Sequence, residues 1–144
     1  MRSDSRSDCP VNAAIEIVGD KWSMLIMRDI TFGDRRQFRQ LQSQMKEGIT
    51  PSVLSDRLTR LVRAGVLHKA AQGPGRPTVY SLTESGIQLI PVLITLGGWG
   101  ARHGGIPETL QAEPQELEAA GPERWNLIME DLRSRHLEAL NSST

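Results

Sequence analysis

Three arginines alternate with leucines in the stretch GITPSVLSDRLTRLVRAGVL, which spans residues 48–67. At 100° per residue, the side chains that share a narrow apolar arc are Leu54, Leu58, Leu61 and Val62. Arginines outside that arc are able to bind phosphate oxygens and base edges, although solvated charge is the ordinary alternative for the outer side of a helix. The neighbouring elements therefore decide whether this stretch is a nucleic-acid-binding helix.

The polar side chains on and beside the opposite face of this helix are the candidate DNA contacts. They are Ser52, Ser55, Asp56, Arg57, Thr59, Arg60 and Arg63. Asp56 is able to accept a hydrogen bond from a cytosine amino group or to orient an arginine. Thr50 is the expected N-cap and a further candidate contact, and Pro51 suits the first helical position. The sequence predicts a helix over 51–64 whose early residues read bases and whose arginines hold phosphates.

Three helices are predicted before this stretch. The first runs from Pro10 to Gly19, and the second runs from a cap at Asp20 to Gly33. A third, short helix is centred on Leu41 and ends before Gly48.

A hairpin and two further helices are predicted after it. Residues 66–69 and 78–82 have strand-like patterns, and they flank the glycine- and proline-rich loop AAQGPGRP. An apolar helix begins at Thr83, and Pro91 should bend or divide it. A last amphipathic helix begins at Pro122.

A short helix, a turn, a second helix and a hairpin in this order predict a winged helix-turn-helix. The expected fold class is α+β and mostly helical, with a two-stranded wing and terminal helices that form a dimer. The second helix of such a unit lies in the DNA major groove. A stiff loop carrying Arg76 suits a narrow minor groove. Arg36, Arg39 and Lys69 are the remaining candidate DNA contacts.

The charge distribution is uneven, although the formal net charge is zero. Residues 1–105 hold 14 Lys and Arg against 9 Asp and Glu, whereas residues 106–144 hold 3 against 8. A basic body with an acidic tail favours contact with a polyanion.

Four segments together resemble the HxlR-type transcriptional regulators, relatives of the MarR winged-helix group. They are CPVNAAIEIVGDKWSMLIMRDITFG at 9–33, FRQLQ at 38–42, GITPSVLSDRLTRLVRAGVL at 48–67 and PTVYSLTESG at 77–86. The resemblance implies a homodimer that binds promoter DNA, usually as a repressor, on a two-fold symmetric operator. This sequence departs from the family pattern at Gln37, where the family usually has a basic residue. The phosphate contact that the resemblance implies is therefore expected at Arg36.

The resemblance also implies that the terminal helices form the dimer. The expected interface residues are Ile15, Leu93, Trp99, Trp125, Ile128 and Leu132. The face of the last helix that carries Trp125 could pack on its own subunit, on the other subunit or on a foreign protein. We favour packing within the dimer, because a long linker precedes this helix.

Two alternative functions remain open at this point. Cys9 resembles a cysteine that senses oxidants or electrophiles in some family members. A helix start lowers a thiol pKa, while the neighbouring Asp8 opposes this. One alternative is therefore a regulator that senses redox state or a small-molecule effector through Cys9 or the dimer interface, and the other is a winged-helix module that binds proteins.

Other classes of protein are not indicated by the sequence. It has no glycine-rich phosphate loop, nucleophile elbow or paired-acid signature, and its histidines lack metal-ligand spacing. We therefore expect no enzyme activity, metal or cofactor. No apolar run approaches the roughly 18 residues of a membrane span, and no signal peptide is visible. A cytoplasmic protein is expected.

The predicted organisation has four parts. They are a disordered N-terminus at 1–8, a winged helix-turn-helix and dimerisation domain at 9–105, an acidic linker at 106–121 and an amphipathic helix at 122–144.

Overall fold

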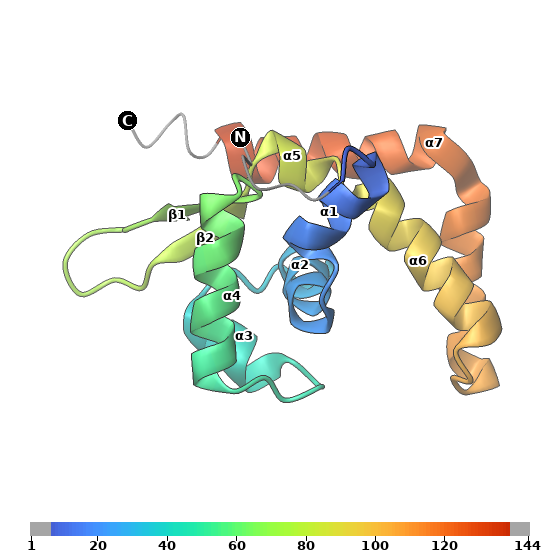
Figure 1. Cartoon of the computed structure of the whole chain (residues 1–144), viewed down its shortest axis with the longest axis horizontal. Helices are drawn as coiled ribbons and strands as arrows, with labels where there is room; N and C mark the ends of the chain where they lie inside the picture. The colour runs from blue at the N-terminus through green and yellow to red at the C-terminus, as the bar shows by residue number, and fades with distance from the viewer. Residues whose placement is uncertain (1–6, 139–144) are drawn as a thin grey trace. The chain divides into compact units, whose positions relative to one another are not determined.

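The computed structural model of the chain describes residues 7–138 (Figure 1). The chain divides into two compact units between Ser81 and Leu82, which differs from the predicted boundary after residue 105. Residues 1–6 of the predicted disordered N-terminus, and the end of the predicted last helix from residue 139, lie outside the described part.

The first unit begins with two helices whose ends follow their capping residues. Helix α1 spans Pro10–Val18, and α2 spans Lys21–Gly33. The Asp20 side chain accepts a hydrogen bond from the backbone N–H of Ser23 at 3.0 Å, which satisfies one of the free donors at the start of α2. The first two predicted helices are therefore confirmed.

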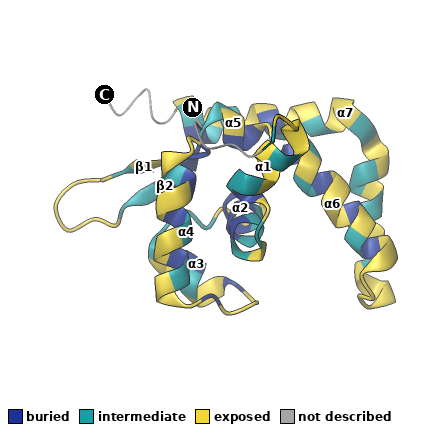
Figure 2. Cartoon of the chain, viewed as in Figure 1, coloured by how far each residue is buried: buried dark blue, intermediate teal, exposed yellow. Residues whose placement is uncertain are grey.

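Helices α3 and α4 form the helix-turn-helix. Helix α3 spans Phe38–Gln44, and α4 spans Pro51–Arg63. The hydroxyl of Thr50 accepts from the backbone N–H of Val53 at 3.4 Å, so the predicted cap is confirmed. The leucines of α4 are at most 1% exposed, and Figure 2 shows the alternation of buried and exposed residues along this helix.

The wing consists of β1, Leu67–Ala70, and β2, Val79–Leu82, which pair with each other. An antiparallel bridge joins Gln37 to Val79, and the backbone N–H of Tyr80 donates to the carbonyl of Arg36 at 2.7 Å. This pairing was not predicted. It fixes the wing to the segment that enters α3.

The second unit contains two helices in place of the single one predicted after Thr83. Helix α5 spans Glu84–Ile87, and α6 spans Ile90–His103. Pro91 lies in the first turn of α6, where its missing N–H costs nothing, so it divides the apolar segment as one of the two predicted outcomes.

The segment predicted as an acidic linker is largely helical, which corrects the assignment of 106–121. A 3₁₀ turn spans Glu108–Leu110, and α7 spans Ala112–Arg133. Alanine, glutamate and glutamine favour helix, and Pro114 lies in the first turn, where it is tolerated. Gly121 has a positive φ of 81° and kinks α7 immediately before Pro122, the predicted helix start. A π-helical turn, Ser134–Glu138, follows α7.

The second unit is held together by contacts between α6, α7 and the turn that follows α7. Arg102 forms an ion pair with Glu118, whose carboxylate lies directly against Gly98, so a Cβ at residue 98 would require this carboxylate to shift. The indole N–H of Trp125 donates to the carbonyl of Leu117 at 2.8 Å across the kink. The backbone N–H of Leu82 donates to Nδ1 of the buried His136 at 2.9 Å. None of the helices within 7–138 is long and apolar enough to cross a membrane.

Candidate nucleic-acid interface

The outer face of α4 carries the polar side chains that the sequence placed there. Among the predicted contacts on this helix, the exposed ones are Ser52, Ser55, Asp56, Thr59, Arg60 and Arg63. The side chains of Asp56 and Arg60 are 57% and 50% exposed, and Asp56 Oδ2 lies 3.8 Å from Arg60 Nη1. The apolar arc packs inward, so this face is the part of α4 that a ligand can reach.

Arg57 differs from the other arginines of α4, because it is hydrogen-bonded to a carboxylate outside this helix. Its Nε donates to Asp20 Oδ2 at 2.8 Å, and its Nη1 donates to Asp56 Oδ2 at 2.7 Å. Its side chain is only 23% exposed. The structure therefore uses this predicted DNA contact to tie α4 to the start of α2.

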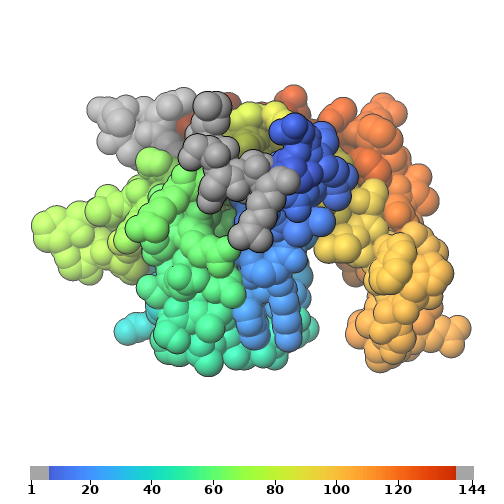
Figure 3. Space-filling view, viewed as in Figure 1, coloured from blue at the N-terminus to red at the C-terminus, as the bar shows by residue number. Residues whose placement is uncertain are grey.

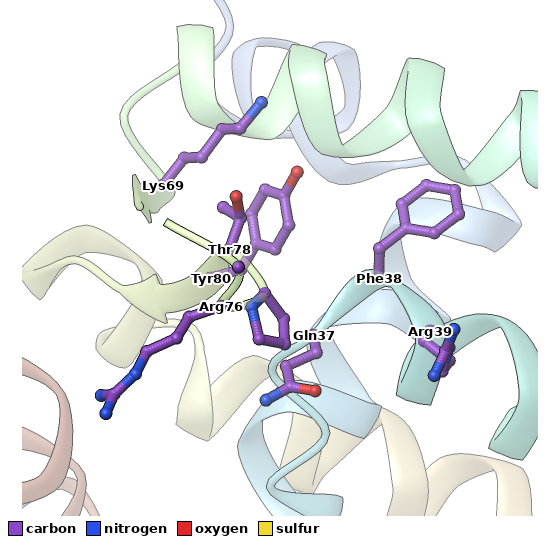
Figure 4. Close-up of a pocket in the computed structure, with 9 residues that line it drawn as sticks. Gln37, Phe38, Arg39, Lys69, Arg76, Thr78 and Tyr80 are labelled. Atoms are coloured by element: carbon purple, nitrogen blue, oxygen red, sulfur yellow. The ribbon is translucent and has the colours of Figure 1, made fainter. Parts of the chain in front are cut away.

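A hollow of about 590 Å³ lies between the wing and the start of α3. Its lining residues are Gln37, Phe38, Arg39, Lys69, Gly75, Arg76, Pro77, Thr78 and Tyr80. Figure 4 shows Arg76 and Arg39 on opposite sides of this hollow, with Tyr80 between Lys69 and Gln37. Three of the lining residues are cationic and none is acidic, so the hollow suits an anionic group such as a phosphate.

A second hollow, of about 280 Å³, lies between α4 and the wing. It is lined by Leu58, Thr59, Val62, Arg63, Lys69 and Tyr80. Because Lys69 and Tyr80 line both hollows, the cationic surface continues from α3 across the wing to α4. We define these residues of α3, α4 and the wing as the basic face.

The wing tip lies beyond the strands and carries Arg76. Gly73 and Gly75 adopt positive φ values of 115° and 76°, and the backbone N–H of Arg76 donates to the carbonyl of Gly73 at 3.1 Å. Figure 3 shows this loop, in light green, standing clear of the helices of its own unit. The turn presents the exposed Arg76 at the end of the hairpin.

Two predicted contacts, Arg36 and Thr50, have hydrogen-bond partners within the first unit. The Arg36 guanidinium donates from Nε to the carbonyl of Tyr80 at 3.3 Å and from Nη2 to the hydroxyl of Ser81. Thr50 uses its hydroxyl to cap α4. Arg36 thus anchors the wing to the segment that enters α3, and its phosphate contact stays a prediction.

Residues 17–106 match the family model described as HxlR-like helix-turn-helix. The chain belongs to this family. A similar protein is the HTH-type transcriptional regulator YdeP of Bacillus subtilis (strain 168), with 34% identity over 76% of this chain and 85% of YdeP. Another is the HTH-type transcriptional regulator Rv3095 of Mycobacterium tuberculosis (strain ATCC 25618 / H37Rv), with 38% identity over 68% of this chain and 61% of Rv3095.

The solved structures agree with this assignment. The crystal structure of PA1607 has a TM-score of 0.65 and 33% identity to this chain, and the likeness covers 74% of this chain and 72% of PA1607. The predicted winged helix-turn-helix fold and the family are therefore confirmed. This HxlR-like chain is a transcriptional regulator with a helix-turn-helix DNA-binding fold.

The predicted interface residues of this HxlR-like chain divide into two groups. Ile15 and Trp99 are 57% and 58% exposed, whereas Leu132 is fully buried. Leu93, Trp125 and Ile128 are half-buried. Leu132 therefore belongs to the core, and Trp125 has a partner within its own unit. Cys9 is exposed at the N-cap position of α1.

Sequence reasoning missed the role of two residues, Tyr80 in the basic face and Asp20 behind α4. Tyr80 was assigned only to a strand, although it lines both hollows. Asp20 was assigned only as a helix cap, although it also holds Arg57. A local signal existed for Tyr80, since alternation along β2 places it on the same side of the hairpin as Thr78. The Asp20–Arg57 pair spans 37 residues and has no local signal.

Three ion pairs between arginine and carboxylate lower the pKa values of the acids. Burial raises the pKa of Asp20, but hydrogen bonds from Ser23 and Arg57 outweigh it and bring the pKa from 3.8 to about 2. The bidentate guanidinium of Arg28 brings the pKa of Glu47 from 4.5 to about 2. Arg133 has the same effect on Glu84, whose pKa also falls from 4.5 to about 2.

We expect these three pairs to make the protein acid-sensitive over a defined range. A carboxyl whose pKa is lower in the folded state stabilises the fold above its unfolded pKa, and this contribution disappears as the pH falls through the folded pKa. The contribution of these pairs to the free energy of unfolding should therefore be constant above about pH 5 and decrease between about pH 4.5 and 2. Urea unfolding followed by circular dichroism at each pH measures this. Glu47→Gln should show a shallower decrease, and an unchanged pH dependence in this variant would contradict the assignment.

Proposed function

We propose that this chain is a homodimeric repressor that binds a two-fold symmetric operator. In this proposal α4 enters the major groove, and the loop carrying Arg76 enters the adjacent minor groove. The observation that supports it most strongly is the continuity of the basic face. Lys69 and Tyr80 join two hollows whose lining residues include cations and no acid. Such a surface suits the phosphates on both sides of a groove.

The proposed roles of the residues in and around the basic face follow from exposure and pairing. Arg39, Arg63, Lys69 and Arg76 hold phosphates, whereas Ser52, Ser55 and Thr59 lie where α4 meets base edges. Arg57 and Arg36 support the site from within the unit, because each is engaged by groups of its own unit.

A dimer is supported by an apolar row on α6 that the single chain leaves exposed. On α6, Val92, Leu96 and Trp99 follow each other at intervals of four and three residues and are 46%, 51% and 58% exposed. They line a hollow of about 480 Å³ together with Thr95. Such a row on one helix face is typical of an interface, and two-fold pairing of protomers matches a two-fold operator.

DNA binding is tested with the full chain and duplexes from the regions that flank its own gene. We expect a preference for one of these duplexes over an unrelated duplex of equal length, and an affinity that falls steeply as salt rises. Footprinting should show a protected site with two-fold symmetry. Expression of a reporter gene placed behind that site should rise when the protein is removed. Equal affinity for all duplexes at low salt would contradict operator binding, and a falling reporter signal would contradict repression.

A further inference from the structure

The exposed face of α4 carries one carboxylate among hydroxyls and cations. Asp56 lies in the middle of the helix, with Ser52, Ser55 and Thr59 on the same exposed side. A carboxylate next to phosphates is repelled, so its presence at a DNA surface needs a donor to compensate it. In the major groove the bases that offer an amino donor are cytosine, through N4, and adenine, through N6.

The side chain of Asp56 is held in place by a chain of charged contacts. Arg57 Nη1 donates to Asp56 Oδ2 at 2.7 Å, and Arg57 Nε donates to Asp20 Oδ2 at 2.8 Å. Asp20 Oδ2 also accepts from the backbone N–H of Ser23, so this carboxylate is fixed to the start of α2. The contact with Arg57 and the approach of Arg60 both involve Oδ2 of Asp56, and Oδ1 takes part in neither.

We propose that Asp56 selects a cytosine in each half of the operator by accepting a hydrogen bond from the cytosine N4 amino group. Asp20 and Arg57 are positioning residues that act through Asp56. This inference rests on the proposed function, because it concerns the base sequence that α4 reads.

Cytosine fits this site better than adenine for an electrostatic reason. Adenine presents the acceptor N7 beside its amino group, and a carboxylate repels that acceptor, whereas the cytosine edge presents the amino donor alone. The guanine paired with cytosine presents two acceptors, O6 and N7, that suit an arginine. Arg60, with Nη1 at 3.8 Å from Asp56 Oδ2, is the adjacent cation able to meet them. Asp56 and Arg60 together therefore match one C·G pair.

The experiment selects bound duplexes from a library with randomised half-sites. The proteins compared are the wild type, Asp56→Asn, Asp56→Ala and Asp20→Asn. The wild type should enrich cytosine over the other bases by about tenfold at one position of each half-site. Asp56→Ala should lose the cytosine preference at that position, and its base preferences at the other positions should stay those of the wild type. Asp56→Asn should shift the same position towards adenine, because an amide pairs with adenine N6 and N7.

Asp20→Asn tests the positioning role. Asparagine still caps α2 as well as aspartate does, but it removes the charge that holds Arg57. We expect the cytosine preference to fall by about threefold at that one position. The thermal midpoint of unfolding should also fall, because an ion pair that stabilises the fold is lost. Glu47→Gln is the matched control, since it neutralises another carboxylate paired with arginine in the same unit. It should leave the selected sequence unchanged.

The outcomes separate this inference from the proposed function. If the wild type enriches one sequence and Asp56→Ala enriches the same cytosine equally, the reading role of Asp56 is overturned while operator binding stands. If the wild type enriches no sequence at all, the proposed function itself is overturned. Asp56 is more than half exposed, so its variants should fold, and circular dichroism checks this.

Discussion

Replacing Arg39, Lys69 and Arg76 together with alanine is expected to reduce DNA affinity by about two orders of magnitude, at about 1 kcal/mol for each phosphate contact. The three cations line one hollow that contains no acid, so no neighbouring charge compensates for their loss. The slope of log affinity against log salt should become shallower by roughly 3, since each contact with a phosphate releases close to one counterion. Fluorescence anisotropy of a labelled duplex at several salt concentrations measures both quantities.

A charge-matched variant controls for net charge. Lys21, Arg124 and Arg135 lie outside the basic face, and their replacement with alanine removes the same three positive charges. This variant should keep the salt slope of the wild type to within about one unit. If the variant that lacks Arg39, Lys69 and Arg76 kept the salt slope of the wild type, the hollow would not hold phosphates. The variant that lacks Arg39, Lys69 and Arg76 should bind both specific and unrelated duplexes more weakly, because phosphate contacts carry no sequence information.

The parts of the fold that the sequence predicted well are those determined by neighbouring residues. Asp20 and Thr50 cap helices that begin one residue later, and Pro91 lies in the first turn of α6. In each case the capping oxygen or the fixed proline φ acts within one helical turn. The helix over 112–120 was missed because the two prolines of the segment 106–121, Pro107 and Pro114, indicated a linker. Its helix depends on α6, to which Glu118 is joined through Arg102.

The sequence predicted which side chains of α4 are exposed more reliably than it predicted what each of them contacts. The periodicity of α4 correctly separated Arg60 and Arg63 from the leucines. It could not show that Arg57 pairs with Asp20 or that Arg36 anchors the wing, because these partners are distant in sequence. The interface prediction failed for Leu132 for a related reason. An apolar stripe shows that this face of the helix is buried, but it does not show whether the same subunit or a partner buries it.

The second large effect is expected at the exposed row of α6. Trp99→Glu places a charge in the proposed dimer interface, where burying an unpaired carboxylate is strongly unfavourable. We expect the protein to become monomeric in sedimentation velocity. Operator affinity should fall by about 10² to 10⁴, because each protomer must then bind its half-site without the high effective concentration that a linked partner supplies.

Leu127→Glu is the matched control for this variant. Leu127 is 61% exposed, about as much as Trp99, but it stands on α7 among the charged residues Glu123, Arg124, Glu130 and Asp131. A single exposed leucine among charges is ordinary for a protein surface, so this variant should remain dimeric. Both substitutions alter exposed side chains and should change the free energy of unfolding of the protomer by no more than about 0.5 kcal/mol. A dimeric Trp99→Glu protein would mean that protomers associate through another surface, for which the row of Val11 and Ile15 on α1 is the next candidate.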